Sequence, residues 1–519
     1  MARAFALAVA LLLMLGGEAQ ATTFKVVVVP TLELEGLEDA AVGLLVPGAG
    51  PKTSAERARA ALVRGEVRNS LRGEPTEGDP LISVESSTFL PQPPVIVLVL
   101  PEGGEQPNDR RYPIAVIGGG FNGLLVSDST RIPGLVSIAD VAPTALGRDD
   151  GLTWQEADDP VAELRALDRR ISENNDSRLA ATLIAAGLIL LFAFVFPRAA
   201  LLGFAAGLAA NLVLGVAGVS EPWLVLVVIG LAVAIGAPAL ALVLRSGLAV
   251  GAALVGVLAA YLVVLGVDGP SVALSPLGPT QNARFYGISN LLGTLFLVPA
   301  LAGAAFLARR FGPAGFAFVA ALALVLVAGS RFGADGGGAI VLAAGFAVLA
   351  VLLARARPRA LAAAGAAALA LVAIFVALDA ATGGSSHVTR ALEGGPGGLL
   401  GDLAERVELS LARLADNAFV AILVVVGIGL LVFLVTRSLR SRAPLEERAP
   451  QLALAAAIAV SLVVNDSPND VILGGVVGFL AVERGMLPRR WVALSWFSRL
   501  HSRWPVAAAA RASRRSPRP

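Results

Sequence analysis

Apolar residues follow two different patterns along this chain, and the change falls near residue 179. Between residues 22 and 178, short apolar runs alternate with turns rich in proline, glycine and acidic residues, as in a soluble domain. From residue 179 onward, many apolar stretches approach the length of about 20 residues that a helix needs to cross a bilayer. The pattern therefore predicts an α-helical polytopic membrane bundle preceded by a small α/β domain.

We expect about eleven membrane spans in the second part of the chain. Their apolar stretches lie at 179–196, 199–218, 222–244, 247–267, 286–308, 313–329, 337–354, 360–380, 417–436, 451–464 and 471–483. The last two are short and cover only about 20 Å each at 1.5 Å per residue. This length favours a broken pair of helices, of the kind that lines binding sites in carriers.

The first part of the chain contains the segments expected in a small α/β domain. Strands are expected at 24–29, 81–84, 95–100, 112–117 and 134–138, and a helix at 54–68. The charged residues of 158–178 predict a helical or flexible connector into the membrane. A G-x-G-x-x-G match at 118–123 is followed by a further strand instead of a helix, so we reject a dinucleotide site.

Residues 1–21 have the features of a signal peptide. Arg3 supplies the positive start, residues 5–15 an apolar core, and residues 19–21 an A-x-A cleavage site. A retained membrane anchor is the alternative, although the apolar core is short for a crossing. Either interpretation predicts that domain 22–178 is exported.

Arginine placement gives an independent prediction of orientation. Most arginines fall in the loops that would be inside, and in the basic tail 485–519, if the N-terminal domain is outside. We therefore expect a multi-pass protein of the bacterial plasma membrane, with transmembrane domain 179–484, exoplasmic loop 381–416 and a cytoplasmic C-terminus.

Composition excludes several kinds of chemistry. Charged residues make up only 15% of the chain, cysteine is absent, and the only histidines are His387 and His501. These counts exclude disulfides and thiolate metal sites, and neither Lys25 nor Lys52 belongs to a P-loop. We expect no metal, no cofactor and no nucleic-acid partner.

The informative polar residues collect on the side expected to be outside. The candidate substrate-binding residues are Arg284, Tyr286, Asn290, Arg331, Asn465, Asp466 and Ser467, and the catalytic candidates are Arg284, Arg331, Asp335, His387 and Asp466. Charged groups at membrane depth are costly, so they usually pair or serve a pathway. Arginine can bind phosphate with its planar fork, and helix starts present unpaired N–H groups to an anion.

Structural explanations compete with this site. Arg284 and Arg331 could extend to lipid headgroups, and Asp335 could pair with Arg331 across one helical turn. Residues 465–470 also form a good tight turn. The amphipathic stretch 400–414, with its apolar stripe, indicates a helix lying in the membrane interface or, alternatively, a lid.

Two resemblances extend these predictions. The chain resembles a group of bacterial membrane proteins in which an exported alkaline-phosphatase-superfamily-like domain precedes a polytopic region. The segments that carry this resemblance are 127–136, 140–146, 284–290, 333–337 and 465–467. Active members of that superfamily have an aspartate after the first strand and several histidine ligands. Here Pro30 follows the strand and residues 22–178 contain no histidine, so the resemblance implies an inactive domain that binds or scaffolds.

A weaker resemblance is to O-antigen ligases and polymerases, which have outward arginines and a late exoplasmic loop. The similar residues here are Arg284, Arg331, His387 and Arg390.

Three functions remain open at the sequence level. The first is transfer or polymerisation of a lipid-linked, phosphate-bearing glycan, with arginines holding phosphate and Asp335, Asp466 or His387 as base. The second is a transporter or flippase of an envelope precursor, and the third a non-catalytic scaffold or sensor. A polar path through the whole membrane would favour transport, and a site closed on one side would favour transfer.

Overall fold

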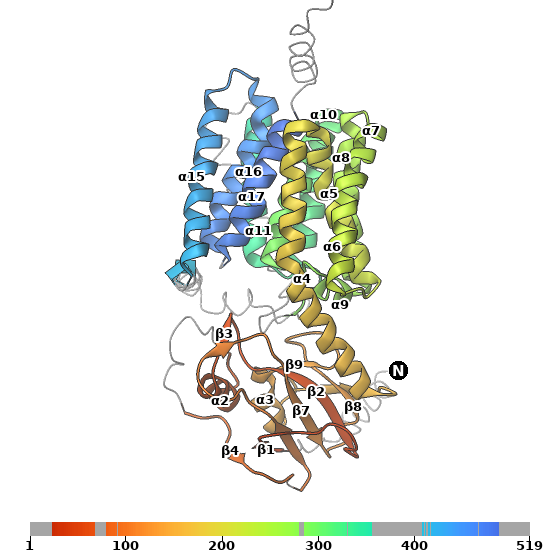
Figure 1. The fold of residues 1–519 in the computed structure, drawn as a ribbon, viewed down its shortest axis with the longest axis vertical. Coiled ribbons are helices and arrows are strands. Elements are labelled where there is room, and N and C mark those ends of the chain that lie inside the picture. Colours follow the sequence, from red (N-terminus) through yellow and green to blue (C-terminus); the bar gives the residue numbers. More distant parts are fainter. Residues whose placement is uncertain are drawn as a thin grey trace, which may run out of the picture.

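The computed structural model describes residues 23–67, 79–90, 92–279, 285–329, 331–354, 407–408, 410–411, 414–415, 417–465 and 467–486. A sheet-containing domain lies at one end and a bundle of long helices at the other (Figure 1). Helix α4 (Pro160–Val195) runs without interruption from the domain into the bundle.

The N-terminal domain is built on one mixed sheet with the strand order β10-β8-β2-β7-β5-β1-β4, and β9 pairs with β2 outside this path. Strand β7 is antiparallel to both of its neighbours, β2 and β5. The strands are β1 (Lys25–Val28), β2 (Ala40–Val46), β4 (Val84–Ser86), β5 (Val95–Leu98), β7 (Tyr112–Ile117), β8 (Gly123–Val126), β9 (Leu135–Ser137) and β10 (Thr153–Gln155).

Helices α2 (Ala55–Arg64) and α3 (Val141–Ala145) pack on this sheet, and β3 (Lys52–Thr53) pairs separately with β6 (Gln106–Pro107). The expected strands at 95–100 and 112–117 and the expected helix at 54–68 correspond to β5, β7 and α2. Between β7 and β8, Gly118 and Gly123 adopt positive φ in a turn that joins two strands. This confirms the rejection of a dinucleotide fingerprint, which has to open a helix.

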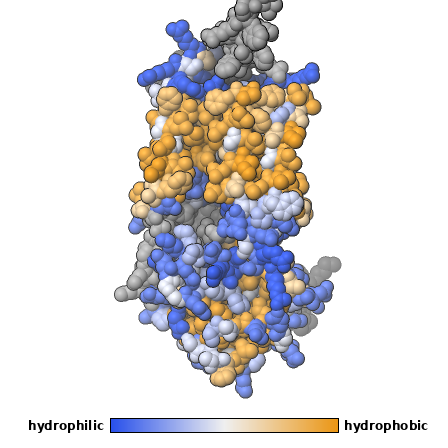
Figure 2. Space-filling view, in the orientation of Figure 1, coloured by the Kyte–Doolittle hydropathy of each residue, from blue (hydrophilic) through white to orange (hydrophobic). Residues whose placement is uncertain are grey.

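The remaining described chain is mostly helical, and eight helices are long and apolar enough to cross a membrane. They are α4, α5 (Pro197–Val216), the α6–η3–α7 helix (Pro222–Val243), α8 (Gly247–Val267), α10 (Asn290–Ala328), α11 (Gly336–Leu353), α15 (Ala418–Arg440) and α16 (Leu445–Val464). On the face shown in Figure 2, an apolar band covers the bundle between two hydrophilic borders. The chain is therefore a multi-pass membrane protein.

Helix α10 contains a reversal of chain direction. Its 39 residues would extend about 58 Å if they were straight. Gly312 leaves helical geometry at φ 62° and ψ −146°, and the backbone N–H of Ile288 lies 3.3 Å from the carbonyl oxygen of Gly333. Both ends of α10 are therefore on the domain-facing side, in agreement with the two separate stretches expected at 286–308 and 313–329.

The two helices expected to be short at the end of the chain are longer than their apolar stretches, and the first of them, α16, is one of the eight helices that could cross a membrane. Helix α16 has 20 residues and α17 (Pro468–Gly485) has 18, which correspond to about 30 and 27 Å. Both helices include charged end residues, among them Glu446 and Glu447 in the first turn of α16. An apolar-run criterion excludes such residues and therefore places the helix ends too far inward. The expected span 360–380 lies outside the described residues.

The sheet domain packs directly against the bundle through an apolar cluster. This cluster joins β2, the loop before β9, α4 and the segment after helix α9 (Gly269–Ala273), and its buried members are Val46, Ile132, Leu135, Ile171, Ala273, Leu274 and Phe285. Such burial contributes about 25 cal/mol per Å² of apolar surface. The domain is thus fixed to the end of the bundle where the candidate residues lie.

Candidate functional site

Three segments that are far apart in sequence meet at the domain-facing end of the bundle. Residues 285–290 contact the turn that precedes α11 through the Ile288–Gly333 backbone hydrogen bond. Asn290 Nδ2, at the start of α10, lies 3.2 Å from Ser467 Oγ, just before α17, and donates to it. The sequence expectation that these polar residues share one side therefore agrees with the arrangement of the chain.

Asp335 lies at the centre of this meeting point. It precedes α11 at the N-cap position but accepts no capping hydrogen bond, and it is only 7% exposed. A Cβ at Gly337 would lie 3.4 Å from Asp335 Oδ1 and 3.1 Å from Asn465 Oδ1. The carboxylate and amide oxygens thus border one small space that the glycine keeps open. We refer to Asn290, Asp335, Asn465 and Ser467 as the domain-facing polar site.

Arg331 lies beside the polar site but does not pair with Asp335. Residues 331–333 form a turn, Ala334 has φ 49°, and the helix begins only at Gly336. The helical i, i+4 geometry that a bridge requires is therefore absent. No ion pair between the two residues occurs in the described part of the chain, and Arg331 is exposed.

Tyr286 connects the polar site to the sheet domain. The guanidinium of Arg131, in the loop between β8 and β9, lies 4.1 Å from the centre of the Tyr286 ring. Such a cation–π contact contributes about 0.5–2 kcal/mol. Arg131 itself adopts φ 56°, which is uncommon for a residue with a side chain. Two sequence motifs that seemed independent, 127–136 and 284–290, are therefore neighbours.

A buried carboxylate holds the Arg131 loop in place. Asp140 accepts hydrogen bonds from the hydroxyl groups of Ser127 and Ser129 and from the backbone N–H of Ser137. Burial raises the pKa of Asp140 above its ordinary value of 3.8, and the two serine hydrogen bonds offset part of that rise. The native state therefore binds a proton here more readily than the unfolded chain.

This shift predicts a pH dependence of stability. Because the pKa of Asp140 is higher in the native state, the free energy of unfolding falls as pH rises from 3.8 through the raised pKa. The Asp140→Asn variant has no carboxyl group to protonate and therefore lacks this pH-dependent contribution. The melting temperature of the wild type minus that of the variant should fall as pH rises over that range. Thermal unfolding of the two full-length proteins across this pH range measures the difference. A wild-type advantage that grows with pH would contradict the assignment.

Helix α4 carries a polar stripe that was not predicted from the sequence. Arg170, Asn174 and Arg178 repeat every four residues and therefore share one helix face. Arg170 and Asn174 donate to the carbonyl oxygen of Leu274 over 3.2 and 2.7 Å, and Arg178 donates to those of Leu277 and Gly278 over 3.0 and 2.6 Å. These bonds satisfy the irregular backbone after α9, which has no helical partners of its own. The repeat at four-residue spacing within 158–178 is the signal that could have revealed this role.

The same irregular segment is held from the other side by α5. Asn211 is fully buried, accepts from the backbone N–H of Leu277 over 2.9 Å, and donates to Tyr261 and Ser275. Ser289 Oγ, just before α10, donates to the carbonyl oxygen of Leu277 over 2.7 Å. Leu277 is therefore the common anchor of α4, α5 and α10.

Buried polar side chains of the described bundle occur at its two ends. The domain-facing group includes Asn174, Asn211, Ser275, Ser289, Thr294, Asp335, Ser461 and Asn465. At the opposite end Gln451 Nε2 donates to Ser438 Oγ over 2.7 Å. Between these groups, the buried residues of α10, α11, α16 and α17 are apolar or glycine. The described spans therefore contain no continuous polar path between the two membrane surfaces.

Several candidate residues lie outside the described part of the chain. They are Arg284, His387, Arg390 and Asp466. The amphipathic stretch 400–414 is described only at a few positions, one of which is Ser410. Its buried hydroxyl donates to the carbonyl oxygen of Asn465 over 3.1 Å. This contact places one residue of the late loop against the domain-facing polar site.

The described residues contain no group of three or more histidine, cysteine, aspartate or glutamate side chains that could hold a metal ion. Comparison of the chain with protein-family models, with curated proteins and with solved structures found no match. The fold and the site therefore define a multi-pass membrane protein with an N-terminal α/β sheet domain seated on a polar site. The two family resemblances stay predictions.

Proposed function

We propose that the chain is a bacterial plasma-membrane protein that binds a lipid-linked, phosphate-bearing glycan at its domain-facing polar site, for transfer or polymerisation. The observation that carries this proposal is the large group of buried polar residues at the domain-facing end of the described bundle, which an apolar middle separates from the Gln451–Ser438 pair at the other end. A one-sided site suits a reaction at one membrane surface, whereas a carrier needs polar groups along its path.

The chemistry of the site supports a phosphate-bearing ligand. Helices α10, α11 and α17 all begin here, so their unpaired N–H groups and positive dipole ends are directed toward the same region. Arg331 is exposed beside the site and can bind phosphate oxygens with its fork. Asp335 supplies a carboxylate in the role of base for an incoming hydroxyl.

The proposed orientation places the N-terminal domain outside the cell. It rests on the signal-peptide pattern of residues 1–21 and on the arginine-rich loops at the opposite end of the bundle, where Arg437 pairs with Glu483. An outer location excludes nucleotide sugars as donors, so the glycan would arrive on a lipid. The sheet domain, without the aspartate and histidines of an active phosphatase, would bind ligand or position the site.

The scaffold or sensor alternative is favoured by one observation. The Arg131–Tyr286 contact and the apolar cluster around Ile132 and Phe285 would transmit a shift of the sheet domain to the start of α10. A scaffold requires this junction but needs no ligand in the polar site. Variants that remove only the polar side chains should therefore abolish a ligand-binding function and leave a scaffold function intact.

A deletion strain complemented with variants tests the proposal. The lipid-linked glycan profile of the deletion strain should show accumulated precursor. Expression of the wild-type protein should restore the normal profile. Arg331→Ala should fail to restore it at unchanged protein abundance, and Arg331→Lys should restore it poorly because an ammonium lacks the planar fork.

Arg169→Ala provides the matched control, since Arg169 is an exposed arginine of α4 away from the site. It should complement fully. An unchanged glycan profile in the deletion strain, or full complementation by Arg331→Lys and Arg331→Ala, would overturn the proposed function.

A further inference from the structure

A charged groove lies between the ends of α15 and α17, at the end of the bundle away from the sheet domain. Its lining residues are Phe433, Thr436, Arg437, Arg440, Ser441 and Glu483. We refer to it as the α15–α17 groove. It contains about 880 Å³ of space free of protein atoms, part of it open to the surroundings. On this side of the bundle the apolar band gives way to hydrophilic residues (Figure 2), so the groove lies at the level of lipid headgroups.

One arginine of the groove is held in place by a nearly buried acid. Arg437 Nη2 donates to Glu483 Oε2, and the side chain of Glu483 is only 11% exposed. A guanidinium has five N–H donors, so this pair leaves others of Arg437 available to a ligand. The carboxylate, in contrast, is already paired and poorly accessible to a second cation.

The second arginine is not used to cap the helix that carries it. The last carbonyl oxygens of a helix need donors from elsewhere. In α15, those of Ser438 and Leu439 accept from Arg448 of α16 over 2.7 and 3.2 Å. The side chain of Arg440 is exposed and forms no hydrogen bond or ion pair within the part of the chain that the structure describes. Its guanidinium is therefore available to an anion at the groove.

The charged end of the groove continues into an apolar surface. Phe433 lies two turns before Arg440, which is about 10 Å along the helix. Val432, Phe433 and Leu439 are exposed on α15. The combination of free cationic donors with an apolar surface suits an amphiphilic anion.

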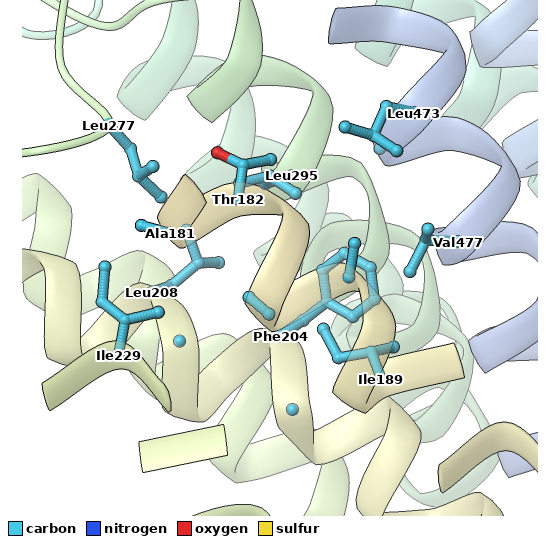
Figure 3. A pocket seen from close by; sticks show the side chains of 15 residues that line it. Ala181, Thr182, Ile189, Phe204, Leu208, Ile229, Leu277, Leu295, Leu473 and Val477 are labelled. Atoms are coloured by element: carbon cyan, nitrogen blue, oxygen red, sulfur yellow. The ribbon is translucent and has the colours of Figure 1, made fainter. Parts of the chain in front are cut away.

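The pocket between α4, α5 and α17 lacks this combination (Figure 3). Among the described residues that line it, Thr182 alone has a polar side chain, and its hydroxyl donates to the carbonyl oxygen of Arg178 over 2.8 Å. That pocket therefore offers no charge to a headgroup.

We propose that the α15–α17 groove binds the headgroup of an anionic phospholipid of the phosphatidylglycerol type, from the leaflet on this side of the membrane. The phosphate accepts hydrogen bonds from Arg437 and Arg440, and the chains lie along Val432 and Phe433. Basic pockets between membrane helices are typical sites for such headgroups. A zwitterionic headgroup fits less well, because Glu483 is already paired and cannot receive its ammonium. The inference goes beyond the proposed function and does not depend on it, since the two sites lie at opposite ends of the bundle.

Native mass spectrometry of the full-length protein, with dioleoylphosphatidylglycerol as probe, tests the inference. Arg440→Ala should lower the affinity about fivefold, because one arginine near an anionic lipid contributes about 1 kcal/mol. Arg245→Ala is the matched control, since it removes an exposed arginine at the same end of the bundle, after α7 and outside the groove. This variant should bind the lipid as wild type does.

Two further ligands distinguish the source of the phosphate. Dioleoylphosphatidylethanolamine should bind the wild-type protein more weakly than the phosphatidylglycerol, and glycerol 3-phosphate should not displace the lipid at equal concentration. Equal affinities of wild type and Arg440→Ala would overturn the site. Equal binding of the phosphatidylethanolamine would overturn the preference for an anionic lipid, and displacement by glycerol 3-phosphate would indicate a soluble phosphate ligand instead.

A measurement on the wild-type protein covers the case in which Arg440→Ala does not fold. A phosphatidylglycerol with a diazirine in its headgroup should, on illumination, label peptides that contain residues 433–441 of α15 or Glu483 of α17. Labelling confined to other helices would overturn the inference.

Discussion

Gly287→Ala is expected to lower the free energy of unfolding by about 3–5 kcal/mol and to abolish function. Gly287 adopts φ 75°, and a Cβ at this position would lie 2.1 Å from the carbonyl oxygen of Gly333. The same carbonyl oxygen accepts the hydrogen bond from the backbone N–H of Ile288, which brings residues 285–290 against the turn before α11. The substitution must therefore separate two of the three segments that form the polar site. Thermal unfolding of the purified protein measures the loss.

Gly120→Ala is the matched control for this prediction. Gly120 also has a positive φ, of 84°, but a Cβ there meets nothing within 4 Å. Its cost should be limited to backbone strain of about 1–2 kcal/mol. Equal melting temperatures for the two variants would show that the Gly287–Gly333 contact contributes nothing.

Arg178→Ala is expected to destabilise the protein by about 3 kcal/mol, because it removes the buried donor to the carbonyl oxygen of Gly278 and one of the two side-chain donors to that of Leu277. The irregular segment after α9 would then be attached to α4 only through the bonds of Arg170 and Asn174 to Leu274. Yield in detergent and melting temperature should both fall. Arg178→Lys should recover part of the stability, because one ammonium cannot replace the guanidinium geometry.

Arg169→Ala is again the control, since it removes an exposed arginine from the same helix. Its effect should stay within about 0.5 kcal/mol. A similarly small effect of Arg178→Ala would contradict the assignment of α4 as the support of this segment.

The membrane part of the fold follows from sequence because apolar length and helix geometry are local properties. The reversal at Gly312 was predictable for the same reason, since an arginine pair and a glycine–proline step interrupt one long apolar region. Strand β2 was missed, although it pairs with β7, β8 and β9 at the centre of the sheet. Its sequence, AAVGLLV, has no alternation, because nearly all of its residues are buried on both faces.

The candidate site was predictable only in part. Topology alone placed Asn290, Asp335, Asn465 and Ser467 on one side of the membrane, because each lies at the end of an apolar stretch. Their direct proximity depends on contacts such as Gly287–Gly333, which join residues far apart in sequence and have no local signal. For the same reason, the sequence did not predict that Arg178 and Asn211 hold the segment after α9. Both side chains bond to backbone groups of that segment, which is far from them in sequence.

The central claim is that the domain-facing polar site binds the phosphate-bearing lipid of a lipid-linked glycan. The chain contains no cysteine, so a single Ser467→Cys substitution introduces the only reactive thiol. In proteoliposomes, polyprenyl phosphate should slow maleimide labelling of this cysteine several-fold and leave labelling of Thr153→Cys, on exposed strand β10, unchanged. Polyprenol should have little effect. Labelling of Ser467→Cys at the same rate with and without polyprenyl phosphate would contradict the account.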